Sequence, residues 1–259
     1  MSPPFTLKSY AKILDTFIAS DIPTSTVEEY IRRKEPDQSV AVLRHDVDRR
    51  PDRALEMAQL ESKKGIKATY YFRLCKASFA PATIQQISNL GHEIGYHYEA
   101  LSLASGNFDL AAEIMMRDIR TLSGLAPIHT ASMHGRPFSR WNNSDIWKKY
   151  RPSDFGLLGE AYQSIDYSKI EYLNDTGRTW HATRFNIRDH VKSSDANAIQ
   201  PDSNKDLIKY IEKKAHEKLM MCLSAHPERW PKQLPGLATS WATDQIINLA
   251  KHILMLTRR

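Results

Sequence analysis

The sequence predicts an α/β fold in which helices cover a mainly parallel sheet. Short runs of β-branched and aromatic residues alternate along the chain with longer amphipathic segments, the pattern of strand–helix–strand units. Acidic residues and histidines recur where the strands are expected to end, and in parallel sheets such residues meet at one edge. The 259 residues suit one large domain. We expect a single domain over residues 1–259 with its core at about 38–230.

Hydrophobic spacing predicts the elements in order. Helical spacing at residues 7–20 and 25–33 places two helices before a first strand at 40–45. Pro51 suits the first turn of the next helix, and Gly65 ends it. Residues 186–204 show little pattern and are expected to form a long loop. Further strands are predicted at 66–72, 94–98, 128–133, 170–173 and 219–225, and further helices at 81–90, 110–122, 145–151, 205–217 and 243–256.

The composition is that of a soluble globular protein, with 41% hydrophobic and 25% charged residues. No apolar run approaches the roughly 18 residues of a membrane helix, so we expect no transmembrane segment. The first residues lack a basic stretch followed by an apolar core, which argues against a secretory signal. Cys75 and Cys222 have neither metal-site nor disulfide spacing. These features together predict a cytoplasmic protein.

The net charge of +6 is mild for a chain of this size. Basic residues are spread along the sequence, and no groove-reading motif accompanies them, so we expect no nucleic-acid partner. An anionic or nucleotide-linked sugar is compatible with this charge.

The stretch Leu43–Asp48, with the sequence Leu-Arg-His-Asp-Val-Asp, is the first indication of function. Side chains two apart in a strand share a face, so Asp46 and Asp48 project together while His45 and Val47 point away. Two carboxylates on one face repel each other unless a cation or a proton lies between them. Later strands also end in acidic or imidazole groups, namely His97, Glu99, His134, Asp175 and His226. This pattern predicts a metal-assisted hydrolase.

Four motifs resemble those of the polysaccharide deacetylase (NodB-homology) superfamily, carbohydrate esterase family four. Gly91–His97 closely matches Gly-His-Glu-Ile-Gly-Asn-His, and Val42–Asp48 is similar to the first motif, Thr-Phe-Asp-Asp. Met221–His226 resembles the closing Leu-x-x-His motif, and Asp175 with Trp180 resembles the Asp…Trp motif. The resemblance covers residues 38–230 and implies a distorted (β/α)7-type barrel of mostly parallel strands. A divergent bacterial branch is similar in its His-Gly, Asp-Thr-Gly-Arg and His-Pro-x-Arg-Trp patterns.

The resemblance also implies roles for individual residues. Asp46 is expected to be the general base and His226 the general acid, with Asp175 and Arg178 orienting Asp46. A divalent metal ion, zinc by preference, is expected on Asp48 and His97. Leu101 stands where the family has a second histidine, so His134 or Glu99 replaces that ligand. His134 is favoured because Asp, His and His form an ordinary zinc set. The expected substrate contacts are Glu99, Arg136, Trp180 and Trp230.

The function implied is hydrolysis of an acetyl group from an N- or O-acetylated sugar in surface-glycan metabolism. The carbohydrate substrate is expected to be linked to a nucleotide or a lipid. One alternative is a catalytically silent glycan-binding barrel that has lost metal, which the missing histidine favours. Another is a hydrolase of a different C–N bond, because one fold serves many reactions.

Overall fold

The computed structural model describes residues 5–33, 38–136, 138–181, 200–232 and 236. The helix predicted at 243–256 and most of the loop predicted at 186–204 lie outside these ranges. Within them, parallel strands form one curled sheet in the order β6-β5-β4-β3-β2-β8-β7, and β1 pairs with the start of β2. The strands are β1 (Thr24–Ser25), β2 (Val40–Val47), β3 (Thr69–Phe72), β4 (Glu93–Tyr98), β5 (Ile128–Met133), β6 (Gly159–Glu160), β7 (Glu171–Asn174) and β8 (Met220–Ala225).

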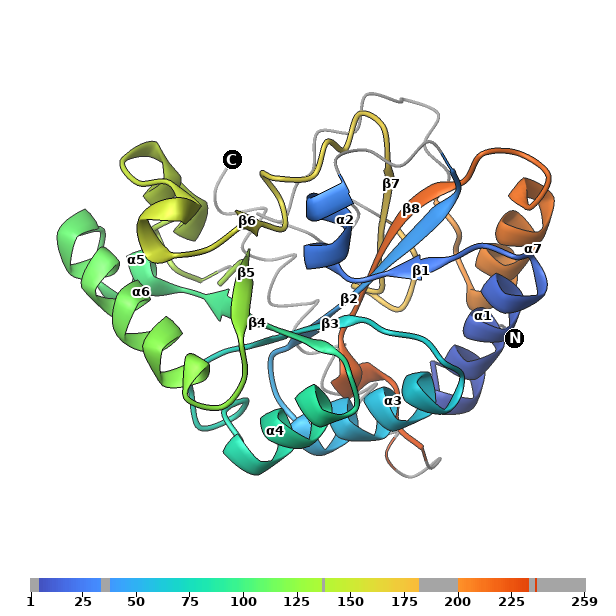
Figure 1. Cartoon of the computed structure of the whole chain (residues 1–259), viewed down its shortest axis with the longest axis horizontal. Helices are drawn as coiled ribbons and strands as arrows, with labels where there is room; N and C mark the ends of the chain where they lie inside the picture. The colour runs from blue at the N-terminus through green and yellow to red at the C-terminus, as the bar shows by residue number, and fades with distance from the viewer. Residues whose placement is uncertain (1–4, 34–37, 137, 182–199, 233–235, 237–259) are drawn as a thin grey trace.

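Helices surround the outside of the curled sheet, as Figure 1 shows for α1, α3, α4, α6 and α7. The helix α2 instead lies in the middle of the curl (Figure 1), where Val27 and Tyr30 pack with Val40 and Val42. The α-helices are α1 (Leu7–Ala19), α2 (Val27–Arg33), α3 (Pro51–Lys63), α4 (Pro81–Asn89), α5 (Ala100–Leu103), α6 (Phe108–Ser123) and α7 (Asn204–Lys214). Short 3₁₀ helices follow β5 and β8, namely η1 (Asn143–Lys148), η2 (Pro152–Phe155) and η3 (Pro227–Arg229).

Strand β2 separates two apolar cores. Its outward residues Ala41, Leu43 and Val47 join the large core beneath the outer helices. Its inward residues Val40 and Val42 join a smaller core inside the curl. Because every β2 residue is buried, the strand is apolar on both faces near its start, as expected for a central parallel strand. Only towards its carboxyl end do polar residues replace the apolar ones.

The structure confirms the predicted fold, a distorted (β/α)7-type barrel of parallel strands with outer helices. The strands β1 and β6 were not predicted, because two residues are too few to show a period of two. In place of the helix predicted at 145–151 the structure has the 3₁₀ helix η1, which ends at Lys148, and a second 3₁₀ helix, η2, begins at Pro152.

The strand order explains how distant segments reach one site. β2 lies between β3 and β8, with β4 and β5 further along one side and β7 beyond β8 on the other. In the β4–β5 pair, His97 stands opposite Ser132, and the backbone N–H of His134 donates to the carbonyl of Tyr98 at 2.9 Å. The carboxyl ends of these strands therefore surround the end of β2.

Candidate metal and catalytic centre

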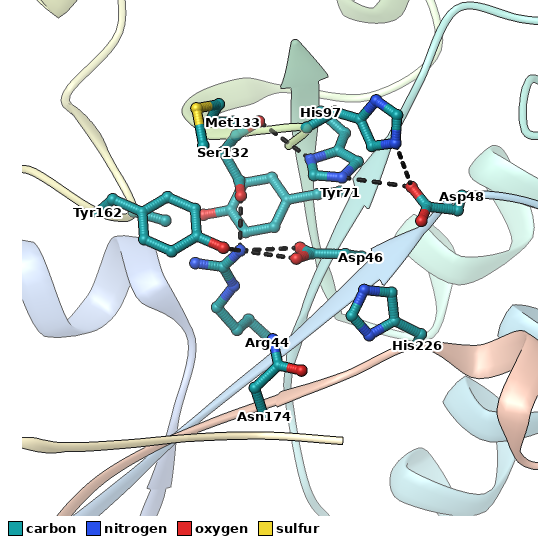
Figure 2. A network of polar contacts seen from close by, with 12 residues as sticks. Arg44, Asp46, Asp48, Tyr71, His97, Ser132, Met133, Tyr162, Asn174 and His226 are labelled. Carbon is teal, nitrogen blue, oxygen red and sulfur yellow. Dashed lines mark hydrogen bonds and ion pairs between the residues drawn. The ribbon is translucent and has the colours of Figure 1, made fainter. Parts of the chain in front are cut away.

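The inward face of β2 carries the residues expected from the alternation of the strand. Arg44 and Asp46 point into the curl, and Asp48 follows one residue after the strand ends. Figure 2 shows Asp46 and Asp48 projecting to the same side. His45 points outward, where its Nε2 donates to Glu61 Oε1 at 2.8 Å. The predicted shared face of the two aspartates is thus present.

Asp48, His97 and His134 form one group whose ligand atoms all lie within 4.8 Å of one another. The Nε2 atoms of both histidines lie 3.4 Å from the same atom, Asp48 Oδ1. That oxygen is buried and accepts no hydrogen bond from the described residues. Zinc–nitrogen and zinc–oxygen bonds of about 2.0–2.1 Å place the ligands of a tetrahedral site roughly 3.3 Å apart. The spacing and the donor types therefore fit a divalent cation such as zinc.

Each histidine of this group is oriented through its other ring nitrogen. His97 Nδ1 donates to the carbonyl of Ser132 at 3.0 Å, and His134 Nδ1 donates to Glu99 Oε2 at 3.1 Å. In the tautomers that donate from Nδ1, the Nε2 atoms carry no proton and face Asp48 Oδ1. Such contacts behind a ligating imidazole are the usual way in which proteins orient metal ligands.

Glu99 supports His134 rather than approaching the other two members of the group. Arg73 Nη2 donates to both oxygens of Glu99 at 2.9 and 3.0 Å. Burial alone would raise the pKa of Glu99, but His134 and Arg73 lower it to about 2. Leu101, which stands where the family has a histidine, is buried in α5. Of the two alternatives for the third ligand position, the geometry favours His134.

Arg44 contacts Asp46, and the sequence analysis missed it. Its Nη2 donates to the two carboxylate oxygens at 2.8 and 3.0 Å and to Ser132 Oγ at 2.6 Å. The guanidinium lies 4.6 Å from the ring centre of Tyr162 and 5.4 Å from that of Tyr71. Burial alone would raise the pKa of Asp46, but Arg44 and then His97 and His226 lower it. The alternation of β2 already placed Arg44 on the inward face and was the available signal.

Gly95 in β4 makes room for this arrangement. A Cβ atom at Gly95 would lie 2.2 Å from Cε1 of Tyr71, far inside van der Waals contact. The absence of a side chain lets the Tyr71 ring lie against β4, and its hydroxyl reaches Thr130 Oγ1 at 2.9 Å. Gly95, which belongs to the Gly91–His97 motif, thus allows the ring to pack beside Arg44.

His226 stands on the other side of Asp46 from His97 (Figure 2). Asp175 holds the ring of His226 in place. Its Nδ1 donates to Asp175 Oδ1 at 2.7 Å, and its backbone N–H donates to Asp175 Oδ2 at 2.8 Å. Arg229 also contacts Asp175, with its Nη1 only 2.7 Å from His226 Nδ1. Burial and Arg229 lower the pKa of His226, but Asp175 outweighs them and the net shift is upward. The raised pKa favours the protonated form of His226, which is the form that an acid requires.

Asp175 contacts His226 and not Asp46, which differs from the expectation, whereas the role of Arg178 stays a prediction. Asp175 and Arg178 were both expected to orient Asp46, whereas Asp175 holds His226 and the guanidinium on Asp46 is that of Arg44. Arg178 Nη1 reaches the carbonyl of Arg229 at 3.4 Å, and its backbone has a φ of 58°. The positioning role is therefore divided between two strands: β2 supplies it for Asp46, and the end of β7 supplies it for His226.

The predicted substrate contacts differ in their placement. Trp180 and Trp230 are fully buried beside Phe5, and their ring centres are 5.7 Å apart. Trp230 Nε1 donates to Asp175 Oδ2 at 2.8 Å, so its polar edge supports His226. Stacking of either indole on a sugar does not fit this placement. Arg136 is half-exposed, with its Nη1 3.8 Å from Glu99 Oε2, and its substrate contact stays a prediction.

Glu228 is a second residue that the sequence analysis missed. Its carboxyl group is buried two residues after His226, with Oε1 3.8 Å from Arg49 Nε. Burial and then the charge of Asp48 raise its pKa to about 7. The only sequence signal was that Glu228 occupies the variable position x of the His-Pro-x-Arg-Trp pattern. An acidic residue at that position does not by itself indicate a function.

No family model matches the chain, and no curated protein matches it either. Solved structures of carbohydrate esterase family four are similar to it. A pseudoenzyme of that family from Bacillus anthracis has 12% identity and a TM-score of 0.45 over 82% of this chain and 62% of its own. An esterase of the family from Streptococcus mutans has 12% identity and a TM-score of 0.47 over 89% of each chain. A peptidoglycan deacetylase from Bacillus subtilis has 14% identity and a TM-score of 0.38 over 84% of this chain and 98% of its own.

The chain spans less than two thirds of the length of the Bacillus anthracis protein. At these identities and TM-scores the functional case rests on the site itself. Among the described helices, none is both long and apolar enough to cross a lipid bilayer.

Proposed function

We propose that this protein is a metal-dependent hydrolase that removes an acetyl group from an N- or O-acetylated sugar. The observation that carries the proposal is the position of His97 Nε2 and His134 Nε2, each 3.4 Å from the buried Asp48 Oδ1. Without a cation, three polar atoms would face one another at a distance too long for good hydrogen bonds. Asp46 and His226 stand next to this group, as an acid–base pair requires.

Asp48, His97 and His134 would hold the divalent cation, for which zinc is the first choice because of the two imidazoles. When bound, such a cation supplies Lewis acidity to a carbonyl oxygen and lowers the pKa of water towards about 7. Asp46 accepts the proton of the attacking water, and Arg44 keeps its carboxylate ionised and oriented. His226 donates a proton to the leaving nitrogen or oxygen, and Asp175 keeps its ring in place.

Two features support an acetylated sugar as the substrate. The motifs of the sequence resemble those of the deacetylase superfamily, and the half-exposed Arg136 and the carboxylate of Glu99 border the metal group. A nucleotide- or lipid-linked sugar and a cytoplasmic location are further parts of the proposal. The two free cysteines, Cys75 and Cys222, are compatible with that location.

The direct test is the metal content of the purified protein, measured together with acetate release from N-acetylated amino sugars. We expect about one divalent cation per chain, loss of activity on chelation and recovery on addition of zinc. Anomalous scattering at the zinc edge should locate the ion between Asp48, His97 and His134. A protein that carries no metal after mild purification and takes none up on titration would be the silent glycan-binding barrel instead.

The variant Asp48→Ala separates metal binding from the remaining chemistry. We expect it to lose the metal and the activity together, whereas the exposed-site control Asp206→Ala should keep both. Asp206 lies in the first turn of α7, where it contacts Ser203, and it is not part of the metal group. Retained activity in a metal-free Asp48→Ala protein would contradict the assignment.

A further inference from the structure

A cavity of about 720 Å³ lies between the first turns of α1 and α7, apart from the metal group. The two helices lie side by side in Figure 1. Their starts are joined by Asn204 Nδ2, which donates to Ser9 Oγ at 3.3 Å. Both helices begin near the segments that follow β7 and β8, since Leu7 N donates to the carbonyl of Pro231 and Trp180 N to that of Pro201. The cavity thus belongs to the same end of the barrel as the candidate centre.

Most of the charged residues that line the cavity are basic. Its described lining contains one acidic residue, Glu212, and five lysines: Lys8, Lys12, Lys205, Lys209 and Lys232. All five lysines are exposed, and within the described part of the chain none forms an ion pair. Elsewhere on the surface, Lys64, Lys149 and Lys214 each pair with an acidic neighbour. Five ammonium groups without an ion pair to a described residue therefore surround one hollow.

This arrangement opposes the stability of the two helices. Lys8 and Lys205 occupy the first turns of α1 and α7, where the helix dipole disfavours positive charge. The acidic residue of the first turn of α7, Asp206, accepts from Ser203 Oγ and does not line the cavity. Like charges around one hollow also repel each other. A bound anion would remove both penalties at once.

The kind of positive charge indicates the kind of anion. Lysine offers a compact charge that suits phosphate, whereas the described lining lacks the arginine fork that recognises a carboxylate in two contacts. The volume is within the range of sites for small ligands, about 300–1,000 Å³. We propose that this cavity binds a diphosphate group carried by a small molecule. The site is independent of the metal group and of the hydrolysis assigned to it.

The test is calorimetric titration of the chelator-dialysed protein with inorganic pyrophosphate at about 0.15 M salt, which screens weak surface attraction. We expect saturable binding that the double variant Lys12→Gln/Lys209→Gln weakens by about tenfold or more, because two charge-assisted contacts are lost. The matched control Lys213→Gln/Lys218→Gln removes the same charge from residues outside the lining and should bind as the unchanged protein does. Equal weakening in both double variants, or no binding by the unchanged protein, would overturn the proposal.

A second variant keeps the test independent of folding. Lys8→Gln/Lys205→Gln should bind pyrophosphate more weakly but unfold at the same or a higher temperature without ligand, because its charges oppose the helix dipoles. A lower unfolding temperature together with unchanged binding would contradict the proposal. Two further ligands distinguish the source of the diphosphate. Tighter binding of uridine diphosphate than of pyrophosphate assigns a nucleotide, and tighter binding of a short prenyl diphosphate assigns a lipid carrier.

Discussion

Strand β2 presents a histidine–carboxylate cluster on each of its faces, and the two clusters differ in how their polar atoms are satisfied. On the outward face, Glu61 accepts hydrogen bonds from Tyr10, Tyr70 and His45 at 2.6, 2.6 and 2.8 Å. On the inward face, Asp48 Oδ1 has two imidazole nitrogens at 3.4 Å and no hydrogen bond from the described residues. The same types of residue thus give a closed cluster and an open one, a few residues apart.

Short hydrogen bonds satisfy the oxygen atoms of a carboxylate. A longer distance between a carboxylate oxygen and imidazole nitrogens leaves room for a metal ion between them. Glu61 needs no further partner, so the outward cluster is expected to stabilise the packing of α1 and α3 on the sheet. The inward cluster is expected to bind a metal ion and to take part in the hydrolysis. The identity of buried histidines and carboxylates therefore does not indicate function by itself. The distances between their polar atoms distinguish a structural cluster from a metal site.

The largest effect is expected from Asp46→Asn on the inward face. Turnover should fall by about 10²–10⁴-fold, because an amide cannot accept the proton of the attacking water. The metal content of the variant should equal that of the unchanged protein, since Asp46 is not among the three ligand residues. Kinetics and metal analysis on the same sample measure both quantities. A drop in metal content equal to the drop in turnover would show that Asp46 belongs to the ligand set.

Glu61→Leu tests the outward face. We expect the free energy of unfolding to fall by about 3–5 kcal/mol, because two buried hydroxyls and one imidazole lose their acceptor. The affinity for metal of the folded protein should not change. Urea unfolding and metal titration provide the two measurements, and Glu113→Gln on the exposed side of α6 is the control. Loss of metal affinity in Glu61→Leu without loss of stability would remove the distinction between the two faces.

The outward cluster also has an expected dependence on pH. Burial alone would raise the pKa of Glu61, but His45 and His92 lower it below its usual 4.5. An acid whose pKa is lowered on folding contributes stability above its unfolded pKa and loses it as the pH falls through the folded value. Acid unfolding of the unchanged protein should therefore be steeper below about pH 4.5 than that of Glu61→Leu.

Glu99→Gln should have a smaller effect, confined to the metal group. Its contact with His134 Nδ1 orients the imidazole, and loss of such a contact typically weakens metal affinity by about 10–100-fold. Competition with a metal-binding dye measures the affinity. Glu113→Gln again serves as the control. If Glu99→Gln abolished metal binding as completely as His134→Ala does, Glu99 would itself be a ligand.

The smallest effect is expected at Arg229, which touches the His226–Asp175 pair. Arg229 lowers and Asp175 raises the pKa of His226. The acid must be protonated, so activity is lost as the pH rises through that pKa. Arg229→Gln should therefore move the alkaline limb of the pH–rate profile upward by about one unit or less, and Asp175→Asn should move it downward. Shifts in the opposite directions would exclude His226 as the acid.

Much of the site could be predicted because Asp46 and Asp48 are close together in the sequence, at the end of β2. Alternation along one strand decides that Asp46 and Asp48 share a face and that His45 does not. Alternation of strands and helices predicts a parallel sheet, and the end of each strand predicts the edge where His97, His134 and His226 meet. These are local properties of the chain, and they determine which residues reach the site.

Only the tertiary structure decided what those residues contact once they are there. The choice of His134 over Glu99, the link from Ser132 to both His97 and Arg44, and the burial of Trp180 and Trp230 depend on strand register and on packing between distant segments. Arg44 was visible in the sequence, but its pairing with Asp46 needed the rings of Tyr71 and Tyr162 and the space left by Gly95. Strand periodicity acts over two residues, whereas these distances are determined by contacts between residues far apart in the chain, as in the Arg44–Tyr162 pair with its separation of 118 positions.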